Sequence, residues 1–149
     1  MILFSLALGP GLIINLIFKD HINRPRPIQL IQFGGQHHYN PPLIQGEAPL
    51  LPHNANRSFP CGHCSSGFVL FIGFFIFRQT GRKRLALLSV VTAVLLGSLI
   101  GVARMASGGH YLSDIVWSAY LTFISCWLVY LAVNRINEPF LSSTKKRVI

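Results

Sequence analysis

Apolar residues are gathered in four long runs, and polar residues collect between them. The runs cover residues 1–18, which Gly9-Pro10-Gly11 interrupts, 64–77, 85–102 and 115–133. A helix that spans a bilayer needs about 20 apolar residues, with a range of about 17–25. The third and fourth runs have this length, whereas the second has it only if residues 58–63 extend it. Four such runs leave too little polar chain to enclose them in a soluble fold. The pattern therefore predicts an all-α integral membrane protein, a bundle of about four transmembrane helices.

The composition favours lipid rather than water around much of the surface. Hydrophobic residues make up 51% of the chain and charged residues only 11%, whereas soluble domains have about a quarter of their residues charged. The net charge is +9, but the basic residues form short clusters at the ends of the apolar runs. This pattern is typical of membrane proteins and disfavours nucleic-acid binding, so the expected partner is the lipid bilayer.

The basic clusters also predict the orientation in the membrane. Eight basic residues follow the second and fourth runs and should be cytoplasmic: Arg78, Arg82, Lys83, Arg84, Arg135, Lys145, Lys146 and Arg147. The long loop 19–60 and the turn 104–114 then lie on the opposite side. The first run lacks the basic start and the cleavage site of a signal peptide, so we expect a transmembrane helix there. These features predict a multi-pass protein of the bacterial inner membrane with its polar site facing the periplasm.

Three polar clusters should meet on this outer side of the membrane. They are residues 19–27 after the first run, 60–63 before the second, and 104–114 between the third and fourth. Ionisable residues at membrane depth are energetically costly, which makes each one a functional candidate. Lys19, Arg26 and Arg104 can cradle phosphate oxygens. The amides that open a helix at Gly62 can bind the same anion.

Two histidines in these clusters can supply the reactive groups. Asp114 lies four residues after His110, so the two share a helix face and the carboxylate can fix the tautomer of the imidazole. A phosphate held between His110 and His63 suggests phosphoryl transfer, in which one histidine attacks and the other protonates the leaving oxygen.

In order and spacing, these clusters resemble the signature of a known phosphatase family. Lys-x6-Arg-Pro at 19–27, Pro-x-Gly-His at 60–63 and Arg-x5-His-x3-Asp at 104–114 resemble the three motifs of the type-2 phosphatidic acid phosphatase superfamily. Membrane members of that superfamily have six spanning helices. The resemblance therefore implies one phosphatase domain over residues 1–149 that lacks two N-terminal helices. The chain departs from the motifs at Cys61 and Ala103, where members usually have serine.

The resemblance also implies a mechanism that uses no metal or other cofactor. His110 would be the nucleophile that forms a phosphohistidine, oriented by Asp114, and His63 would be the acid and later the base. The residues expected to bind the phosphoryl group are Lys19, Arg26, Cys61, Gly62 and Arg104.

The expected substrate is an anionic phospholipid or a lipid A-type molecule. Arg24-Pro-Arg-Pro followed by Phe33-Gly-Gly, and Ser58-Phe-Pro before the second motif, are similar to bacterial lipid A phosphatases. Undecaprenyl pyrophosphate and phosphatidylglycerol phosphate are close alternatives. The sequence indicates no oligomeric state.

Cys61-Gly-His-Cys64 supports other hypotheses. It matches the dithiol of a disulfide oxidoreductase, which would require a thioredoxin-like fold of alternating strands and helices. A zinc site with His37, His38 or His53 is conceivable, although the spacing is not standard. A non-catalytic anion-binding protein would keep the cations but have no use for paired His110 and Asp114. On the oxidising periplasmic side, a Cys61–Cys64 disulfide could form and distort the phosphate site.

Overall fold

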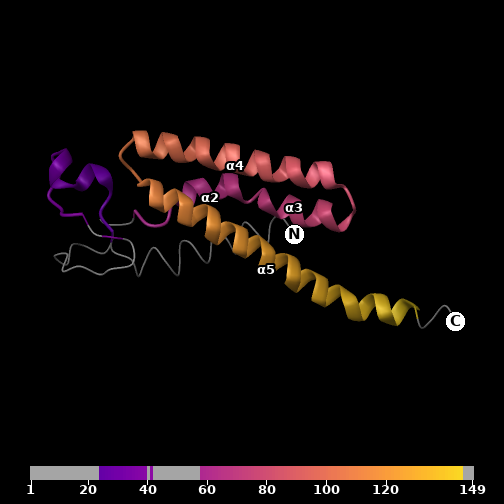
Figure 1. The fold of residues 1–149 in the computed structure, drawn as a ribbon. Coiled ribbons are helices and arrows are strands. Elements are labelled where there is room, and N and C mark those ends of the chain that lie inside the picture. Colours follow the sequence, from indigo (N-terminus) through magenta and orange to yellow (C-terminus); the bar gives the residue numbers. More distant parts are fainter. Residues whose placement is uncertain (1–23, 40, 42–57, 146–149) are drawn as a thin grey trace.

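The computed structural model describes residues 24–39, 41 and 58–145, with side chains as far as residue 135. In this part, two short 3₁₀ helices, η2 (Pro27–Gln29) and η3 (Ile31–Phe33), precede the α-helices α2 (Gly62–Phe68), α3 (Phe71–Gln79), α4 (Lys83–Ala106) and α5 (Leu112–Lys145). Figure 1 shows α2 and α3 end to end beside α4, with α5 running past them. The described residues form no β-strand, and their extended backbone makes isolated bridges such as the one between Leu30 and His37. The predicted all-α fold is confirmed for these residues.

The second predicted helix, 64–77, is present as two helices joined by a tighter turn. Ile72 N donates to Val69 O (3.1 Å) and Gly73 N donates to Leu70 O (3.0 Å), three residues back instead of four. This 3₁₀ geometry separates α2 from α3. The helix begins at Gly62, so residues 58–61 do not lengthen it as a spanning helix would require.

Small residues let α4 pack closely against its neighbours. The buried residues of α4 are Ala86, Ala93, Gly97 and Gly101, and the last three recur at intervals of four on one helix face. A Cβ atom on Gly67 of α2 would lie 2.7 Å from the backbone nitrogen of Gly97. Close approach of α2 and α4 therefore requires glycine at this contact, as at many helix interfaces in membranes.

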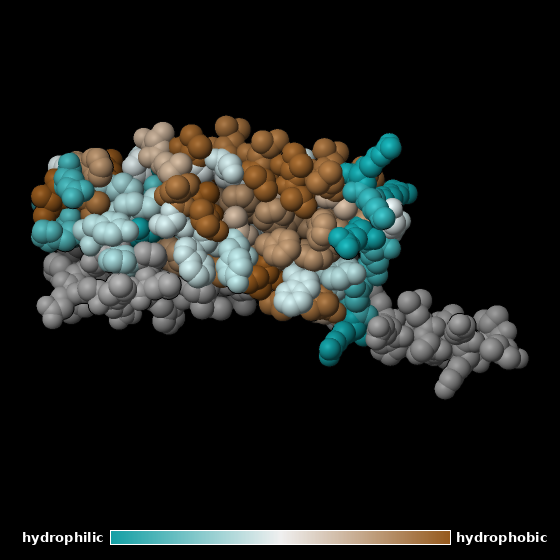
Figure 2. All heavy atoms as spheres, in the orientation of Figure 1, coloured by the Kyte–Doolittle hydropathy of each residue, from teal (hydrophilic) through white to brown (hydrophobic). Residues whose placement is uncertain are grey.

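The outward face of the helices is apolar. Exposed residues of α4 include Leu87, Leu95 and Leu99, and those of α5 include Val116 and Leu128. Figure 2 shows a largely brown band along the helices, with more hydrophilic residues towards both ends. Two helical segments in the described part are long and apolar enough to cross a membrane, Lys83–Ala106 and Leu112–Arg135, and only 22% and 33% of their apolar windows are buried. The first predicted run lies outside the described residues, so the total of four spanning helices stays a prediction.

The two ends of the helices have different polar residues. Residues 24–39, the start of α2 and the turn from α4 to α5 lie at one end, and the turn from α3 to α4 lies at the other (Figure 1). Arg78, Arg82, Lys83 and Arg84 are exposed around this second turn. The described parts of the three predicted polar clusters thus share one end, opposite the basic turn.

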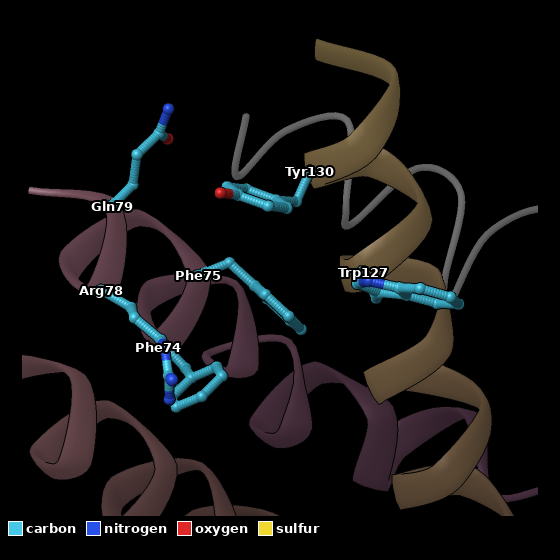
Figure 3. Close-up of a pocket in the computed structure, with 6 residues that line it drawn as sticks. All are labelled: Phe74, Phe75, Arg78, Gln79, Trp127 and Tyr130. Atoms are coloured by element: carbon cyan, nitrogen blue, oxygen red, sulfur yellow. The ribbon is translucent and has the colours of Figure 1, made fainter. Parts of the chain in front are cut away.

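A pocket of about 420 Å³ at the basic end is lined by aromatic residues of α3 and α5. Phe74, Phe75, Arg78 and Gln79 of α3 and Trp127 and Tyr130 of α5 line it. In Figure 3 the side chains of Phe75 and Tyr130 extend into the space between the two helices. The guanidinium of Arg78 lies 5.6 Å from the centre of the Phe74 ring. Because α5 rises about 1.5 Å per residue, Trp127 lies roughly 20 Å along the helix from its start. Aromatic and basic residues in this position are typical of the membrane–water interface, and the pocket is not part of the histidine site.

Candidate active site

Backbone hydrogen bonds join the three polar clusters at one end of the helices. Ser58 N donates to Arg24 O (3.1 Å), and Ile28 N donates to Gly108 O (3.1 Å). Cys61 N donates to Asp114 O (3.3 Å). The first bond joins the first cluster to the residues just before the second. The second bond joins the residue just after the first cluster to the third cluster, and the last bond links the second and third clusters directly. Residues up to 80 positions apart in the chain are thereby held together in one site.

Asp114 lies at the centre of this site and is fully buried. Its Oδ2 accepts hydrogen bonds from the Ser58 hydroxyl (2.6 Å) and from Tyr111 N (2.9 Å). Its Oδ1 is paired with the guanidinium of Arg24. A buried carboxylate is tolerated only when it is paired and hydrogen-bonded, and Asp114 meets both conditions.

Arg24 is a residue of the site that the sequence analysis missed. Its side chain is only 1% exposed, and it donates hydrogen bonds to the Ser113 hydroxyl (2.9 Å) and the Tyr39 hydroxyl (3.1 Å) in addition to pairing with Asp114. The guanidinium carbon lies 3.9 Å from the centre of the Tyr111 ring, within the range of a cation–π contact. The repeated Arg-Pro at 24–27 could have indicated that both arginines belong to the site, but the spacing of the first motif pointed to Arg26 alone as a phosphate ligand.

The Tyr111 ring that contacts the Arg24 guanidinium is uncharged. Its edge-to-face partner is Tyr39, with ring centres 5.5 Å apart. Burial raises the pKa of Tyr111 to about 12, with the Arg24 charge acting in the opposite direction. The ring therefore stays protonated at physiological pH and adds no second negative charge beside Asp114.

The two histidines differ sharply in exposure. His110 is 4% exposed, and its Nδ1 lies 3.5 Å from Asp114 Oδ2, just beyond a normal hydrogen bond. His63, in the first turn of α2, is exposed. The predicted approach of His110 to Asp114 is present, but the predicted shared helix face is not, because α5 begins at Leu112 and His110 lies in the turn before it. The catalytic roles of the two histidines stay predictions.

The predicted phosphate-binding arginines both have donors left over. The Nε atoms of Arg26 and Arg104 are buried and have no hydrogen-bond partner among the described residues. A Cβ atom on Gly109 would lie 2.8 Å from Arg104 Nη2, so glycine at this position makes room for the guanidinium. Lys19 lies outside the described residues.

The Cys61–Cys64 disulfide considered from the sequence is present. It joins residues whose Cα atoms are 5.5 Å apart. Cys61 is fully buried and caps α2, because its sulfur accepts a hydrogen bond from Cys64 N (3.3 Å). A disulfide sulfur has no proton to donate, and this cap also occupies one of the amides that open the helix. Phosphate binding by Cys61 and Gly62 stays a prediction. Any contribution of Cys61 to it would come from the backbone and not from the side chain.

The disulfide bears on the two alternatives built on these cysteines. The described residues contain no strand of a thioredoxin-like fold. The paired sulfurs are not thiolate ligands, and no three His, Cys, Asp or Glu residues of the described part lie together as a metal site would need. His37 and His38 lie in the loop after η3, and His53 lies outside the described residues.

The disulfide gives a direct chemical prediction. Of the three cysteines in the chain, Cys126 is the one outside the disulfide, and it is buried. Protein purified and denatured without reductant should take up one alkyl group per chain, and reduced protein should take up three. Mass spectrometry after alkylation measures this difference. Three alkyl groups without reduction would contradict the disulfide.

Comparison with known proteins defines the class of this protein. The family described as the PAP2 superfamily matches residues 1–138. The chain therefore belongs to the PAP2 superfamily, as its three motifs indicated. No solved structure matches the chain.

Curated relatives carry more specific names. The chain is 39% identical over 133 residues to the lipid A 4'-phosphatase of Francisella tularensis subsp. novicida (strain U112), covering 89% of this chain and 57% of that protein. It is 32% identical over 140 residues to the lipid A 4'-phosphatase of Rhizobium leguminosarum, covering 90% and 52%. A lipid A 1-phosphatase of Rhizobium johnstonii (strain DSM 114642 / LMG 32736 / 3841) is 28% identical over 138 residues, covering 86% and 49%. The chain spans about half the length of the curated relatives it matches.

Proposed function

We propose that this chain carries the active site of a membrane phosphatase that removes phosphate from a lipid A-type substrate. The observation that carries the proposal is the arrangement around Asp114. A buried carboxylate lies beside His110, in a site that is joined by backbone bonds to the clusters of Arg26 and His63. Family membership and the names of the relatives support a lipid phosphate as the substrate.

Phosphoryl transfer to the enzyme is the first step of the proposed reaction. With Nδ1 turned towards Asp114, the other ring nitrogen of His110, Nε2, attacks the phosphorus atom. The bond between phosphorus and the lipid oxygen breaks, and that oxygen takes its proton from His63. Asp114 stabilises the positive charge that develops on the ring, as a carboxylate does behind a histidine in other catalytic sites.

Hydrolysis of the phosphohistidine completes the cycle. His63, now without its proton, accepts one from water, and the oxygen of that water attacks the phosphorus. The bond between phosphorus and His110 Nε2 breaks, which releases inorganic phosphate and restores both histidines. The same residue thus acts as acid and then as base, as microscopic reversibility requires.

Cations hold the phosphoryl group through both steps. Lys19, Arg26 and Arg104 are the proposed ligands. The buried Nε atoms of Arg26 and Arg104 have no partner among the described residues, as is also true of Arg24, but no side-chain pairing with Asp114 engages these two arginines. Donors fixed before the reaction stabilise transition-state charge without further reorganisation, which makes them effective catalysts. The reaction so described needs no metal ion.

The proposed location is the inner membrane, with the site facing the periplasm. The basic turn at Arg78, Arg82, Lys83 and Arg84 lies at the end of the helices opposite the histidines. The positive-inside rule then directs that turn to the cytoplasm. Phosphate groups of lipids in the outer leaflet would be within reach of the site.

A phosphate-release assay over a lipid panel tests this function. The detergent-solubilised protein is incubated with lipid A, undecaprenyl pyrophosphate, phosphatidylglycerol phosphate or phosphatidic acid, each with and without EDTA. We expect the fastest release from lipid A and a rate that EDTA changes less than about twofold, since the proposed donors are all side chains. Release that requires an added divalent ion would contradict the mechanism. A clear preference for another lipid would overturn the substrate but keep the reaction.

A further inference from the structure

A second groove opens at the same end of the helices as the histidines. It has a volume of about 360 Å³ and lies between the η2–η3 segment and the end of α4. Pro27, Ile28 and Phe33 form one wall, and Met105 belongs to the opposite wall. Most of the lining is apolar, so the groove suits a hydrocarbon rather than a phosphate.

The position of the groove connects it to the proposed phosphate ligands. Pro27 follows Arg26 directly, and Met105 follows Arg104 directly. The two walls are held together by the bond from Ile28 N to Gly108 O (3.1 Å). Gly108 has a φ of +64°, and a Cβ atom there would lie 3.0 Å from Ile28 Cβ, so the contact favours glycine. Each wall of the groove therefore contains the residue that directly follows a proposed phosphate ligand in the chain.

Large apolar side chains project around the groove. Phe33 is 67% exposed and Ile28 is 59% exposed, and both line it. Ile31 is 52% exposed on the same segment but does not line it. Clustered exposure of this kind marks a surface that contacts lipid or another apolar partner. An apolar groove next to the chain segments of Arg26 and Arg104 suits one class of ligand, an acylated phosphate.

We propose that this groove binds an acyl chain of the lipid substrate while Arg26 and Arg104 hold its phosphate. The inference rests on the proposed phosphatase function and adds the part of the molecule that selects acylated substrates. Phe33 is then a specificity-determining residue, because its ring forms a wall that a substrate without acyl chains does not touch.

The test compares two substrates that differ only in their acyl chains. Phosphate release is measured from lipid A and from its fully deacylated glucosamine disaccharide phosphate, in the same detergent. For Phe33→Ser we expect the ratio of kcat/KM for lipid A to kcat/KM for the deacylated substrate to fall about 10-fold, mainly through KM, since one apolar wall is lost. Phe33→Leu keeps an apolar wall and should restore most of the ratio.

Ile31→Ser is the matched control, since Ile31 is similarly exposed on the same segment but lies outside the groove. We expect it to keep the wild-type ratio. An unchanged ratio in Phe33→Ser, with wild-type protein active, would overturn the groove and leave the phosphatase function standing. Equal losses in both variants would show a general membrane anchor and also overturn it. Wild-type protein that releases phosphate from neither substrate would overturn the function and the groove together.

Discussion

Replacement of His110 by alanine is expected to lower kcat for phosphate release at least about 1,000-fold, the scale of loss when an enzyme nucleophile is removed. The imidazole is buried with Nδ1 facing the Asp114 carboxylate. Alanine leaves no atom that can form the bond to phosphorus, and water alone would have to attack. The phosphate-binding residues are untouched, so KM should change much less than kcat.

Two measurements separate this catalytic loss from a folding defect. Wild-type protein, mixed with radiolabelled substrate and denatured at alkaline pH, should retain labelled phosphate on one histidine, and His110→Ala should retain none. His110→Gln keeps a polar side chain of similar reach and should lose activity equally while keeping the wild-type melting temperature. His38→Ala, at an exposed histidine of the loop, should leave kcat unchanged. Undiminished turnover in His110→Ala would exclude the proposed nucleophile.

The spacing of polar residues predicted that His110 and Asp114 lie close together, but for a reason that the structure does not bear out. Asp114 follows His110 by four residues, which would place both on one face of an α-helix, whereas α5 begins only at Leu112. The two side chains approach each other because the turn before α5 places His110 beside the first turn of that helix. The long apolar runs likewise predicted α4 and α5, since lipid requires a helix to satisfy its own backbone. The grouping of three clusters at one end then followed from the alternation of spanning segments.

The contacts of Arg24 could not be predicted in the same way. Arg24 and Arg26 are each followed by a proline, and both lie in a loop whose sequence has no helical period. The fold buries Arg24 against Asp114 and Ser113, about 90 positions away, and no local pattern specifies a pairing at that distance. Ser58 was missed for the same reason. Its hydroxyl matters only because the loop brings it to Asp114.

Cys61 stands where the second motif usually has serine, and this change alters what the residue can contribute to the site. In place of a hydroxyl that could donate to phosphate, the site has a disulfide whose sulfur accepts from Cys64 N. The residue fixes the start of α2, and its carbonyl accepts from the Ser118 hydroxyl of α5 (2.6 Å). We therefore expect Cys61 to affect catalysis mainly by fixing the position of α2 and of His63 in its first turn. The loss of one hydrogen-bond donor should matter less.

Breaking the Arg24–Asp114 pair is expected to give the largest loss of stability of any single change in the site. Arg24→Met removes the cation and leaves a fully buried carboxylate unpaired, which should lower the free energy of unfolding by about 3–5 kcal/mol. Asp114→Asn leaves the guanidinium unpaired and should also destabilise. The measurement is unfolding in detergent, followed by tryptophan fluorescence as the denaturant fraction rises.

The double variant decides whether the pair itself causes the loss. Arg24→Met with Asp114→Asn removes both charges, so its destabilisation should be smaller than the sum of the single losses by about 1–3 kcal/mol, the coupling expected of residues in contact. Arg82→Met is the matched control, because it removes an exposed arginine at the opposite end of the helices and should change stability by less than about 0.5 kcal/mol. Strictly additive losses would mean that Arg24 stabilises the fold through its other contacts, with Ser113, Tyr39 and Tyr111. In that case the carboxylate beside His110 would be held by Ser58 and Tyr111 N, and Arg24 would have no part in positioning the histidine.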